Sequence, residues 1–513
     1  MRLRIPIFTL LLASAVGLGL RPAYAHGFGE RYDLPVPLDY FLVGAAATVA
    51  LSFVVIGIFV RRRSGAFNYP TLNLLRFRWP AAVLTNRVLL TVIRLVSLAL
   101  FALLVATGLF GTDNPIDNLT PTLVWIIWWV GMGYVSALLG NVWMLINPWK
   151  AAFELGEKLM GGGSRHRETG MFRYPEWLDV WPAVALFLVF AWLENVYRSA
   201  DEPFKLGVLV VAYSVVTWAG MLAFGKHQWL RRGEAFSVLF GFFARFSPTE
   251  VSVTDDRLCG TCGQECNLSG EGCVDCYDCF ERAETGRRQF NLRPYAVGLA
   301  HASRVSTATG VFVVLALATV TFDGLKETPL WVDAQTTLYD AASIFGSYNL
   351  SAIDTAGVLV VPAIFLAVYL AFSWFIREFS AERIPVSDVA RFFVFSLVPI
   401  ALAYNLAHFV SLLLREGQQI IPLASDPFGF GWDIFGTVDY QINFGIVNAK
   451  MVWFISVAAI VLGHIISVYL AHVIALRRMS SHASALRSQY PMLVLMVSYT
   501  ATSLWIIAQP IVE

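Results

Sequence analysis

The chain has 513 residues, of which 57% are hydrophobic and only 14% are charged. About a quarter of the residues of a soluble domain are charged, so this composition and the mean hydropathy of +0.62 exclude an ordinary soluble protein. The formal net charge of +1 gives no reason to expect a nucleic-acid partner. The sequence therefore predicts an all-α integral membrane protein.

Residues 1–25 have the features of a secretory signal peptide. Two arginines precede an apolar run over residues 5–20, and the sequence Ala-Tyr-Ala that ends at Ala25 fits a signal peptidase site. Cleavage there makes His26 the first residue, with an α-amine and an imidazole side by side outside the cytoplasm. The alternatives are an uncleaved first transmembrane helix and an N-terminal histidine without a role.

Ten apolar stretches follow, each close to the length of about twenty residues that a transmembrane helix needs. A shorter apolar stretch over residues 235–246 predicts an interfacial or re-entrant helix. No internal repeat is visible that would indicate an inverted-repeat transporter. We place the spans near residues 40–60, 88–110, 122–146, 179–197, 206–225, 305–322, 357–376, 392–414, 449–475 and 491–510.

Basic residues are distributed unequally between the two sides of these spans. The loops after the odd-numbered spans carry most of them, including three arginines from Arg61 and two from Arg477. Because cytoplasmic loops are rich in Lys and Arg, we expect a protein of the inner (cytoplasmic) membrane whose mature termini both face the periplasm or the cell exterior. The segments on the periplasmic side carry only Arg31, Arg198, Lys205, Lys326 and Arg415.

This topology divides the chain into four parts. A membrane domain with five spans (26–225) follows the signal peptide, and a second one with five spans (305–513) ends the chain. The cytoplasmic loop between them (226–304) contains all six cysteines, in the sequence CGTCGQECNLSGEGCVDCYDC over residues 259–279.

The two C-x2-C pairs of this loop predict a tetrahedral zinc site that is structural. An iron–sulfur cluster also needs four thiolates, although the bacterial run C-x2-C-x2-C-x3-C-P is absent. A reduced loop without metal is the third alternative, since disulfides are disfavoured in the cytoplasm. The predicted ligands are Cys259, Cys262, Cys273 and Cys276, with Cys266 and Cys279 as substitutes.

Several ionisable residues are predicted at the periplasmic ends of the spans. Glu194 closes the fourth span, and His408 lies in the eighth span on the same helical face as Tyr404. Imidazole and carboxylate groups are typical ligands of a catalytic metal that activates water. The predicted catalytic residues are Glu194, His408, Asp426 and Asp433, and the predicted ligands of a divalent metal are His26 and His408.

The same residues also have structural interpretations. His408 is then a hydrogen-bonded core histidine, Glu194 pairs with Arg198, and Asp426 with the proline after it marks a turn. Two histidines of the ninth span, eight residues apart, have a spacing that suits haem ligation or a proton relay, although no equally placed partner histidine is evident. They are His464 and His472.

Five stretches support a resemblance to known proteins. They are AHGFGERYDLPVPL from residue 25, PTLVWIIWWVGMGYVSALLGNVWMLINPW at 121–149, WLRRGEAFSVLFGFFARFSP at 229–248, GCVDCYDCF at 272–280 and LASDPFGFGWDIFG at 423–436. On these stretches, spread over nearly the whole chain, the protein resembles a family of bacterial multi-pass membrane proteins named fenitrothion hydrolase. That family often has a second histidine where this chain has Asn405, and the departure weakens a metal role for His408.

The resemblance implies a membrane-bound hydrolase that cleaves the aryl P–O bond of an apolar organophosphorus triester. We expect such a substrate to arrive from the lipid phase and to be attacked by metal-activated water. The main alternative is a transporter or metal-handling membrane protein without hydrolytic activity. A third possibility is a subunit whose cysteine-rich loop docks a partner protein.

Overall fold

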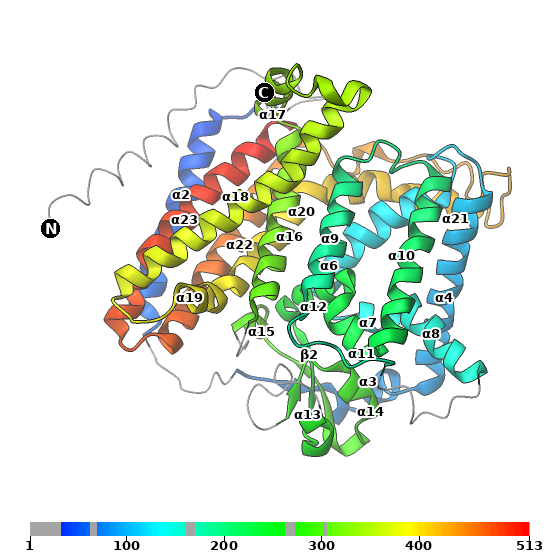
Figure 1. Ribbon diagram of the computed structural model, residues 1–513, viewed down its shortest axis with the longest axis horizontal. Helices are drawn as coiled ribbons and strands as arrows, with labels where there is room; N and C mark the ends of the chain where they lie inside the picture. Colours follow the sequence, from blue (N-terminus) through cyan, green and yellow to red (C-terminus); the bar gives the residue numbers. More distant parts are fainter. Residues whose placement is uncertain (1–31, 62–68, 161–169, 262–271, 301–304, 512–513) are drawn as a thin grey trace.

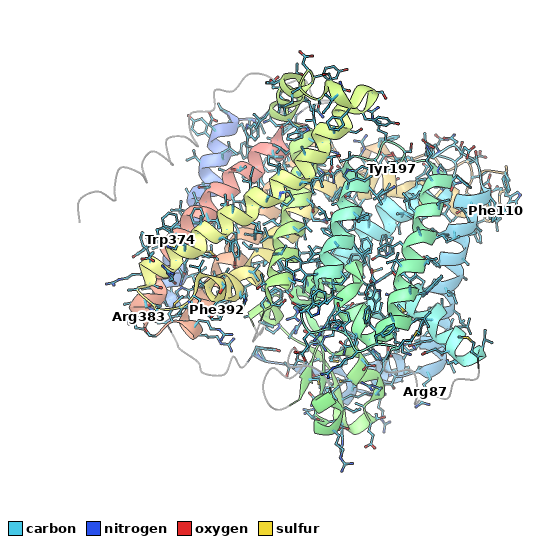
Figure 2. The ribbon with its side chains drawn as sticks, viewed as in Figure 1. Arg87, Phe110, Tyr197, Trp374, Arg383 and Phe392 are labelled. Carbon is cyan, nitrogen blue, oxygen red and sulfur yellow. The ribbon has the colours of Figure 1, made fainter. Side chains whose placement is uncertain are left out.

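Helices dominate the computed structural model, which describes residues 32–61, 69–160, 170–261, 272–300 and 305–511. Figure 1 shows a helical bundle with a small sheet at one end, which we call the sheet face. The other end is the opposite face. Figure 2 labels Arg87 toward the sheet face and Phe110 and Tyr197 toward the opposite face. Predicted features that lie outside the described residues are the signal peptide, His26, Cys262 and Cys266.

Nine helical segments among the described residues are long and apolar enough to cross a membrane, which confirms the predicted class. Only 6% of the apolar window of α4 is buried within the protein, as expected for a helix that faces lipid. The nine segments are α2 (Leu38–Phe59), α4 (Arg87–Phe110), α5 to α6 (Leu119–Leu138), α10 (Pro203–Phe224), α16 (Thr307–Lys326), η5 to α18 (Ser343–Ser380), α19 to α21 (Val386–Ser425), α22 (Ala449–Arg478) and α23 (His482–Ala508).

Polar side chains begin many of these helices. The Asn86 side chain accepts hydrogen bonds from the amides of Val88 and Leu89 at the start of α4. Ser306 and Asn448 cap α16 and α22 in the same way. Each cap supplies an acceptor for the amide groups that have no partner in the first helical turn, and the apolar run after it continues the helix.

The fourth predicted span is shorter than expected. It forms α9 (Trp181–Asn195), whose 15 residues cover less than the ~30 Å hydrocarbon core at about 1.5 Å per residue. The stretch at 235–246 forms α12 (Ala235–Phe246), which contacts α6, α9 and α20. Since most residues of α12 are buried, it packs inside the protein, which excludes the interfacial alternative and leaves the re-entrant helix as a prediction.

A four-stranded antiparallel sheet, which was not expected from the sequence, lies at the sheet face. Its order is β1-β4-β2-β3, with Val251 opposite Phe290 and Val253 opposite Cys273. The strand β1 precedes α4, so the sheet joins the first membrane half to the 226–304 segment. The strands are β1 (Leu72–Asn73), β2 (Thr249–Val253), β3 (Cys273–Val274) and β4 (Arg288–Leu292).

Shorter elements connect these parts. They are η1 (Leu74–Arg76), α3 (Arg78–Leu84), α7 (Trp143–Ile146), α8 (Pro148–Leu159), α11 (Lys226–Gln228), η3 (Trp229–Gly233), α13 (Asp256–Thr261), α14 (Tyr277–Arg282), η4 (Thr285–Arg287), α15 (Val297–Ala300), α17 (Pro329–Leu338) and η8 (Phe444–Ile446). The composite segments contain α5 (Leu119–Pro121), the π-helical η2 (Thr122–Gly131), α6 (Met132–Leu138), η5 (Ser343–Tyr348), α18 (Asn349–Ser380), α19 (Val386–Phe393), η6 (Val394–Leu397), α20 (Val398–Arg415), η7 (Glu416–Gln419) and α21 (Ile420–Ser425).

The helices form two groups that meet along α9 and α16. The helices α2, α16, α18, α20, α22 and α23 pack on one another in one group, and α4 packs on α10 and α6 on α12 in the other. The contacts of α9 with both α12 and α16 join the groups, and α12 also reaches α20. This junction is where the ionisable side chains described next come together.

Candidate functional site

Two opposite charges lie on the most buried of the long helices. Asp323 and Lys326 of α16 are three residues apart, with Lys326 Nζ 3.7 Å from Asp323 Oδ1, and about one-fifth of each side chain is exposed (20% and 19%). Lys326 Nζ also donates to the backbone oxygen of Asn195 at the end of α9, at 2.9 Å. Charges inside an apolar helix are costly, so such a pair is a candidate for function.

His408 approaches the same carboxylate from α20. Its Nε2 lies 2.8 Å from Asp323 Oδ2, and the Tyr404 ring stacks beside it with the centroids 6.3 Å apart. The shared face of Tyr404 and His408 is as predicted. Asp323 was missed because it follows the predicted sixth span, 305–322, by one residue. The sequence did contain a signal for this pair, because Asp323 stands three residues before Lys326 at the end of an otherwise apolar helix.

Glu194 reaches this region from α9. Trp129, which lies in η2, donates its indole N–H to Glu194 Oε1 at 2.6 Å. Arg198, the partner considered from the sequence, instead donates to the hydroxyl of Ser351 at 3.1 Å. Glu194 and Asp323 line a common cavity. We call Glu194, Asp323, Lys326 and His408 the Asp323 cluster.

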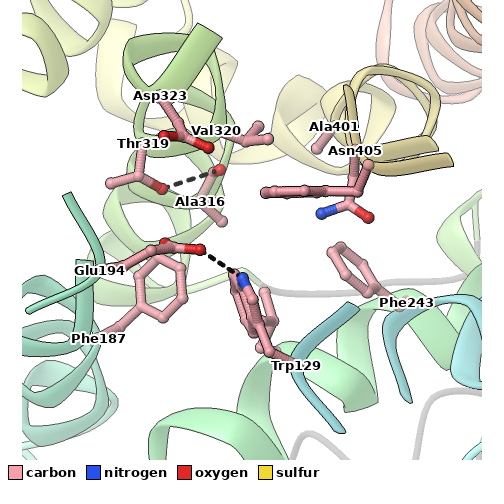
Figure 3. Close-up of a pocket in the computed structure, with 12 residues that line it drawn as sticks. Trp129, Phe187, Glu194, Phe243, Ala316, Thr319, Val320, Asp323, Ala401 and Asn405 are labelled. Atoms are coloured by element: carbon pink, nitrogen blue, oxygen red, sulfur yellow. Dashed lines mark hydrogen bonds between the residues drawn. The ribbon is translucent and has the colours of Figure 1, made fainter. Parts of the chain in front are cut away.

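A small cavity borders both carboxylates. Its volume is about 20 Å³, which is enough for one water molecule. Figure 3 shows Glu194 and Asp323 on one side of it and Asn405 on the other, with the aromatic rings of Trp129 and Phe243 below. The titratable side chains of Glu194 and Asp323 therefore face a space in which one water molecule can hydrogen-bond to them.

A larger pocket lies immediately beside this cavity. It has a volume of about 450 Å³, and its walls come from the end of α9, α17 and the start of α18. Asp354 in this wall accepts hydrogen bonds from Trp331 Nε1 at 2.9 Å and Gln335 Nε2 at 2.8 Å. Glu194 lines both the pocket and the small cavity, so it connects the Asp323 cluster to the pocket.

The other predicted catalytic residues lie in the loop after α21. Asp426 accepts hydrogen bonds from the amides of Phe430 and Gly431, at 3.0 and 2.6 Å, and Asp433 accepts from the amide of Val438 at 3.2 Å. These bonds organise the loop. The structure thus brings Glu194 and His408 to one cluster and places Asp426 and Asp433 in the loop. The predicted approach of His26 to His408 lies outside the described residues.

A second cluster, of cysteines, lies at the sheet face. Cys259 of α13, Cys273 of β3 and Cys279 of α14 are buried, and their sulfur atoms all lie within 4.8 Å of one another. Cys276 is also buried but does not join this group of three. Among the described residues, this is the only group of three or more His, Cys, Asp or Glu side chains close enough to hold a metal ion. Cysteine sulfurs at this spacing suit a metal ion, as the sequence predicted.

No protein-family model, no curated protein and no solved structure matches this chain.

Proposed function

We propose that this chain is a proton-coupled membrane transporter and that the Asp323 cluster is its protonation centre. The observation that carries the proposal is the contact of Asp323 with both His408 and Lys326 beside a cavity for one water molecule, between helices of the two groups. Paired acids and histidines inside membrane helices are characteristic of proton relays in pumps and transporters.

Protonation of Asp323 would change the forces between the helices. The ionised carboxylate attracts His408 on α20 and Lys326, which in turn holds the end of α9. A proton on Asp323 removes that attraction. The relative position of α9, α16 and α20 then depends on the proton, which is the coupling that a transporter needs.

The pocket beside Glu194 would bind the transported solute. Arg198, Gln335 and Ser351 line it together with the two carboxylates of Glu194 and Asp354. A volume of about 450 Å³ with hydrogen-bond donors and acceptors suits a small polar molecule. Because Glu194 also faces the small cavity, occupancy of the pocket and protonation of the cluster are electrostatically linked.

The test is solute-driven proton movement in proteoliposomes with a pH dye trapped inside. A panel of small amino acids, carboxylates and amines is added in turn, under an imposed pH gradient. We expect at least one class to change the internal pH, and Asp323→Asn to abolish this response. Asp113→Asn, in an exposed loop, is the matched control. A response to no class, or an undiminished response in Asp323→Asn, contradicts the proposal.

Hydrolysis of an organophosphorus triester is the second candidate, favoured by the position of Glu194 between the water-sized cavity and the larger pocket. Glu194 would accept a proton from water, the water oxygen would bond to phosphorus, and the aryl oxide would leave. Release of the nitrophenol from fenitrothion by purified protein, with and without added zinc or manganese, tests this reaction. Loss of that release in Glu194→Gln would favour the hydrolase over the transporter.

The cysteine cluster would hold a structural zinc ion. Tetrahedral zinc with bonds of about 2.3 Å keeps its sulfur ligands about 3.8 Å apart, and the sulfurs of Cys273 and Cys279 are 3.7 Å apart. Basic residues around it, including Arg257, Arg282 and Arg288, support a cytoplasmic sheet face and a periplasmic opposite face. The protein would then be an inner-membrane protein with its larger pocket open to the periplasm.

A further inference from the structure

Four buried polar side chains form a row along α22. Ser456, His464, Ser467 and His472 are each at most 1% exposed. At about 100° per residue, Ser456, Ser467 and His464 lie within about 80° of one another around the helix, and His472 lies about 80° beyond His464. Ser456 and Ser467 donate to the backbone oxygens of Ala407 and Ser396, at 3.1 and 2.5 Å, which is how polar residues join membrane helices. The two histidines need another explanation.

His464 lies at the middle of the bundle with half of its hydrogen-bonding capacity unused. Its Nδ1 is 2.8 Å from the backbone oxygen of Ile460, whereas its Nε2 is buried and has no partner among the described residues. The ring lies beside that of Tyr499, with the centroids 5.8 Å apart. The Tyr499 hydroxyl in turn shares a hydrogen bond of 2.6 Å with Thr321 on α16.

Tyr404 continues this row toward the Asp323 cluster. Its side chain is 1% exposed, and its hydroxyl has no partner among the described residues. The hydroxyl lies against Gly324, where an added Cβ would come within 2.5 Å of it. Gly324 follows Asp323 directly, and the Tyr404 ring stacks on His408. Tyr404 therefore lies beside both the end of α16 next to Asp323 and the His408 ring.

The row also reaches the sheet face. His472 Nε2 lies 2.7 Å from the backbone oxygen of Val60, the residue after α2, and its Nδ1 lies 3.0 Å from the Gln489 side chain. Eight residues of helix separate His472 from His464, or about 12 Å. Ser467 lies between them along the axis of α22 but about 140° from His472 around it.

We propose that this row is a proton path that links the sheet face to the Asp323 cluster; it rests on the proposed function, because it supplies protons to the same carboxylate. We call it the polar file, which consists of His472, His464, Tyr499, Thr321 and Tyr404. Its members are imidazoles and hydroxyls, which accept a proton or hydrogen bond on one side and release one on the other. Each transfer moves a proton along the file without any other bond being made or broken.

The two groups without partners are what distinguish a path from a structural network. Burial of a polar group without a hydrogen bond destabilises a fold, so such groups are rare and call for an explanation. A network with every donor and acceptor engaged is held in one arrangement. At Tyr404 and His464 the unused hydroxyl and ring nitrogen leave room for a hydrogen bond to change partner, which proton transfer along the file requires.

The experiment measures proton uptake without any solute. Proteoliposomes loaded with K⁺ and a trapped pH dye receive valinomycin, so that an inside-negative potential drives protons inward. We expect wild-type protein to exceed protein-free vesicles, and Tyr404→Phe and His464→Phe to lower the protein-dependent rate by about fivefold or more. Tyr469→Phe is the matched control, since this tyrosine of α22 is 39% exposed on the outside of the bundle.

Tyr404→Phe keeps the test decisive if His464→Phe folds poorly, because the hydroxyl that it removes has no partner to lose. The polar file would be overturned if Tyr404→Phe took up protons as fast as the wild-type protein. It would also be overturned if vesicles with wild-type protein took up protons no faster than protein-free vesicles. Proton uptake that depends on the file, without a response to any solute, would support the path and contradict the transporter. Solute-driven acidification that persists in both variants would support the transporter and contradict the path.

Discussion

Two buried groups of charges in this protein are built in opposite ways. At the sheet face, Arg293 is wholly buried, with its guanidinium 2.9 Å from Glu250 and 3.2 Å from Asp275. It also donates to the backbone oxygens of Ala244 and Ser247. Although burial lowers the pKa of Arg293, the carboxylates of Asp275 and Glu250 raise it above its ordinary value. Every partner is in place, and the charge is fixed.

In the membrane bundle, the Asp323 cluster is less completely paired. Asp323 has one close contact, to His408, and a longer one to Lys326, while Glu194 has only the indole N–H of Trp129 as its hydrogen-bond partner among the described residues. The cluster also borders a cavity. Complete pairing thus accompanies a structural role, whereas incomplete pairing beside a cavity accompanies the site at which we propose that protons are exchanged.

The largest expected effect is at the fully paired group. Arg293→Leu leaves Glu250 buried without its cation and removes the links from β4 to α12. We expect a loss of about 3–5 kcal/mol of stability, seen as a lowered melting temperature in detergent. Arg287→Gln is the control, because Arg287 is 54% exposed and its ion pair with Asp255 contributes less than about 1 kcal/mol. Equal effects of the two variants would contradict the structural role of the fully paired group around Arg293.

Metal binding at the sheet face gives the next largest effect. Cys259→Ser, Cys273→Ser and Cys279→Ser should each weaken binding of the ion by about tenfold or more, because each removes a thiolate from the group of three. Cys276→Ser should weaken it less, since that sulfur lies outside the group. Elemental analysis after dialysis against a chelator measures the retained metal. A greater loss in Cys276→Ser than in Cys279→Ser would contradict this ligand assignment.

In the Asp323 cluster, we expect Asp323 to interact more strongly with His408 than with Lys326. A double-mutant cycle of Asp323→Asn with His408→Gln should give an interaction of about 1–3 kcal/mol, and one with Lys326→Met less than about 1 kcal/mol. The reason is distance, 2.8 Å for His408 against 3.7 Å for Lys326. Melting temperatures of the four variants in each cycle supply the comparison. A stronger coupling to Lys326 would mean that His408 is not the main partner of Asp323.

Local sequence patterns predicted some of these features well. Apolar runs identified the membrane class and the nine long helical segments of the described residues, and the four-residue spacing of Tyr404 and His408 placed their rings side by side. Both predictions depend on periodicity along one helix. The cysteine spacing likewise indicated a metal-binding group, although it favoured Cys276 over Cys279 as a main ligand.

The rest depends on which helices become neighbours. Nothing in the order of the chain indicates that Trp129 would reach Glu194, 65 residues away, or that His408 would reach Asp323, 85 residues away. Asp323 itself was hidden because a charged last turn looks like the end of a span. The sheet was missed because two of its strands have only two residues and β1 lies far from the others in the sequence.

The smallest predicted effect is an acid sensitivity at the sheet face. Although burial raises the pKa of Glu154, the charges of Lys150, Lys226 and Arg94 lower it below its ordinary value. A carboxyl group whose pKa is lower in the folded state contributes stability above its unfolded pKa of about 4.3 and loses it as the pH falls through the folded pKa. At pH values below about 4.3 the melting temperature should therefore decrease, by the equivalent of about 1 kcal/mol or less, since about one-fifth of the side chain is exposed (21%).

Glu154→Gln should be less stable than the wild type at neutral pH and should lose this part of the acid dependence. Glu176→Gln, in an ion pair whose carboxylate is 90% exposed, should leave the whole profile unchanged. If the two variants have the same profile, the cations around Glu154 do not stabilise the fold.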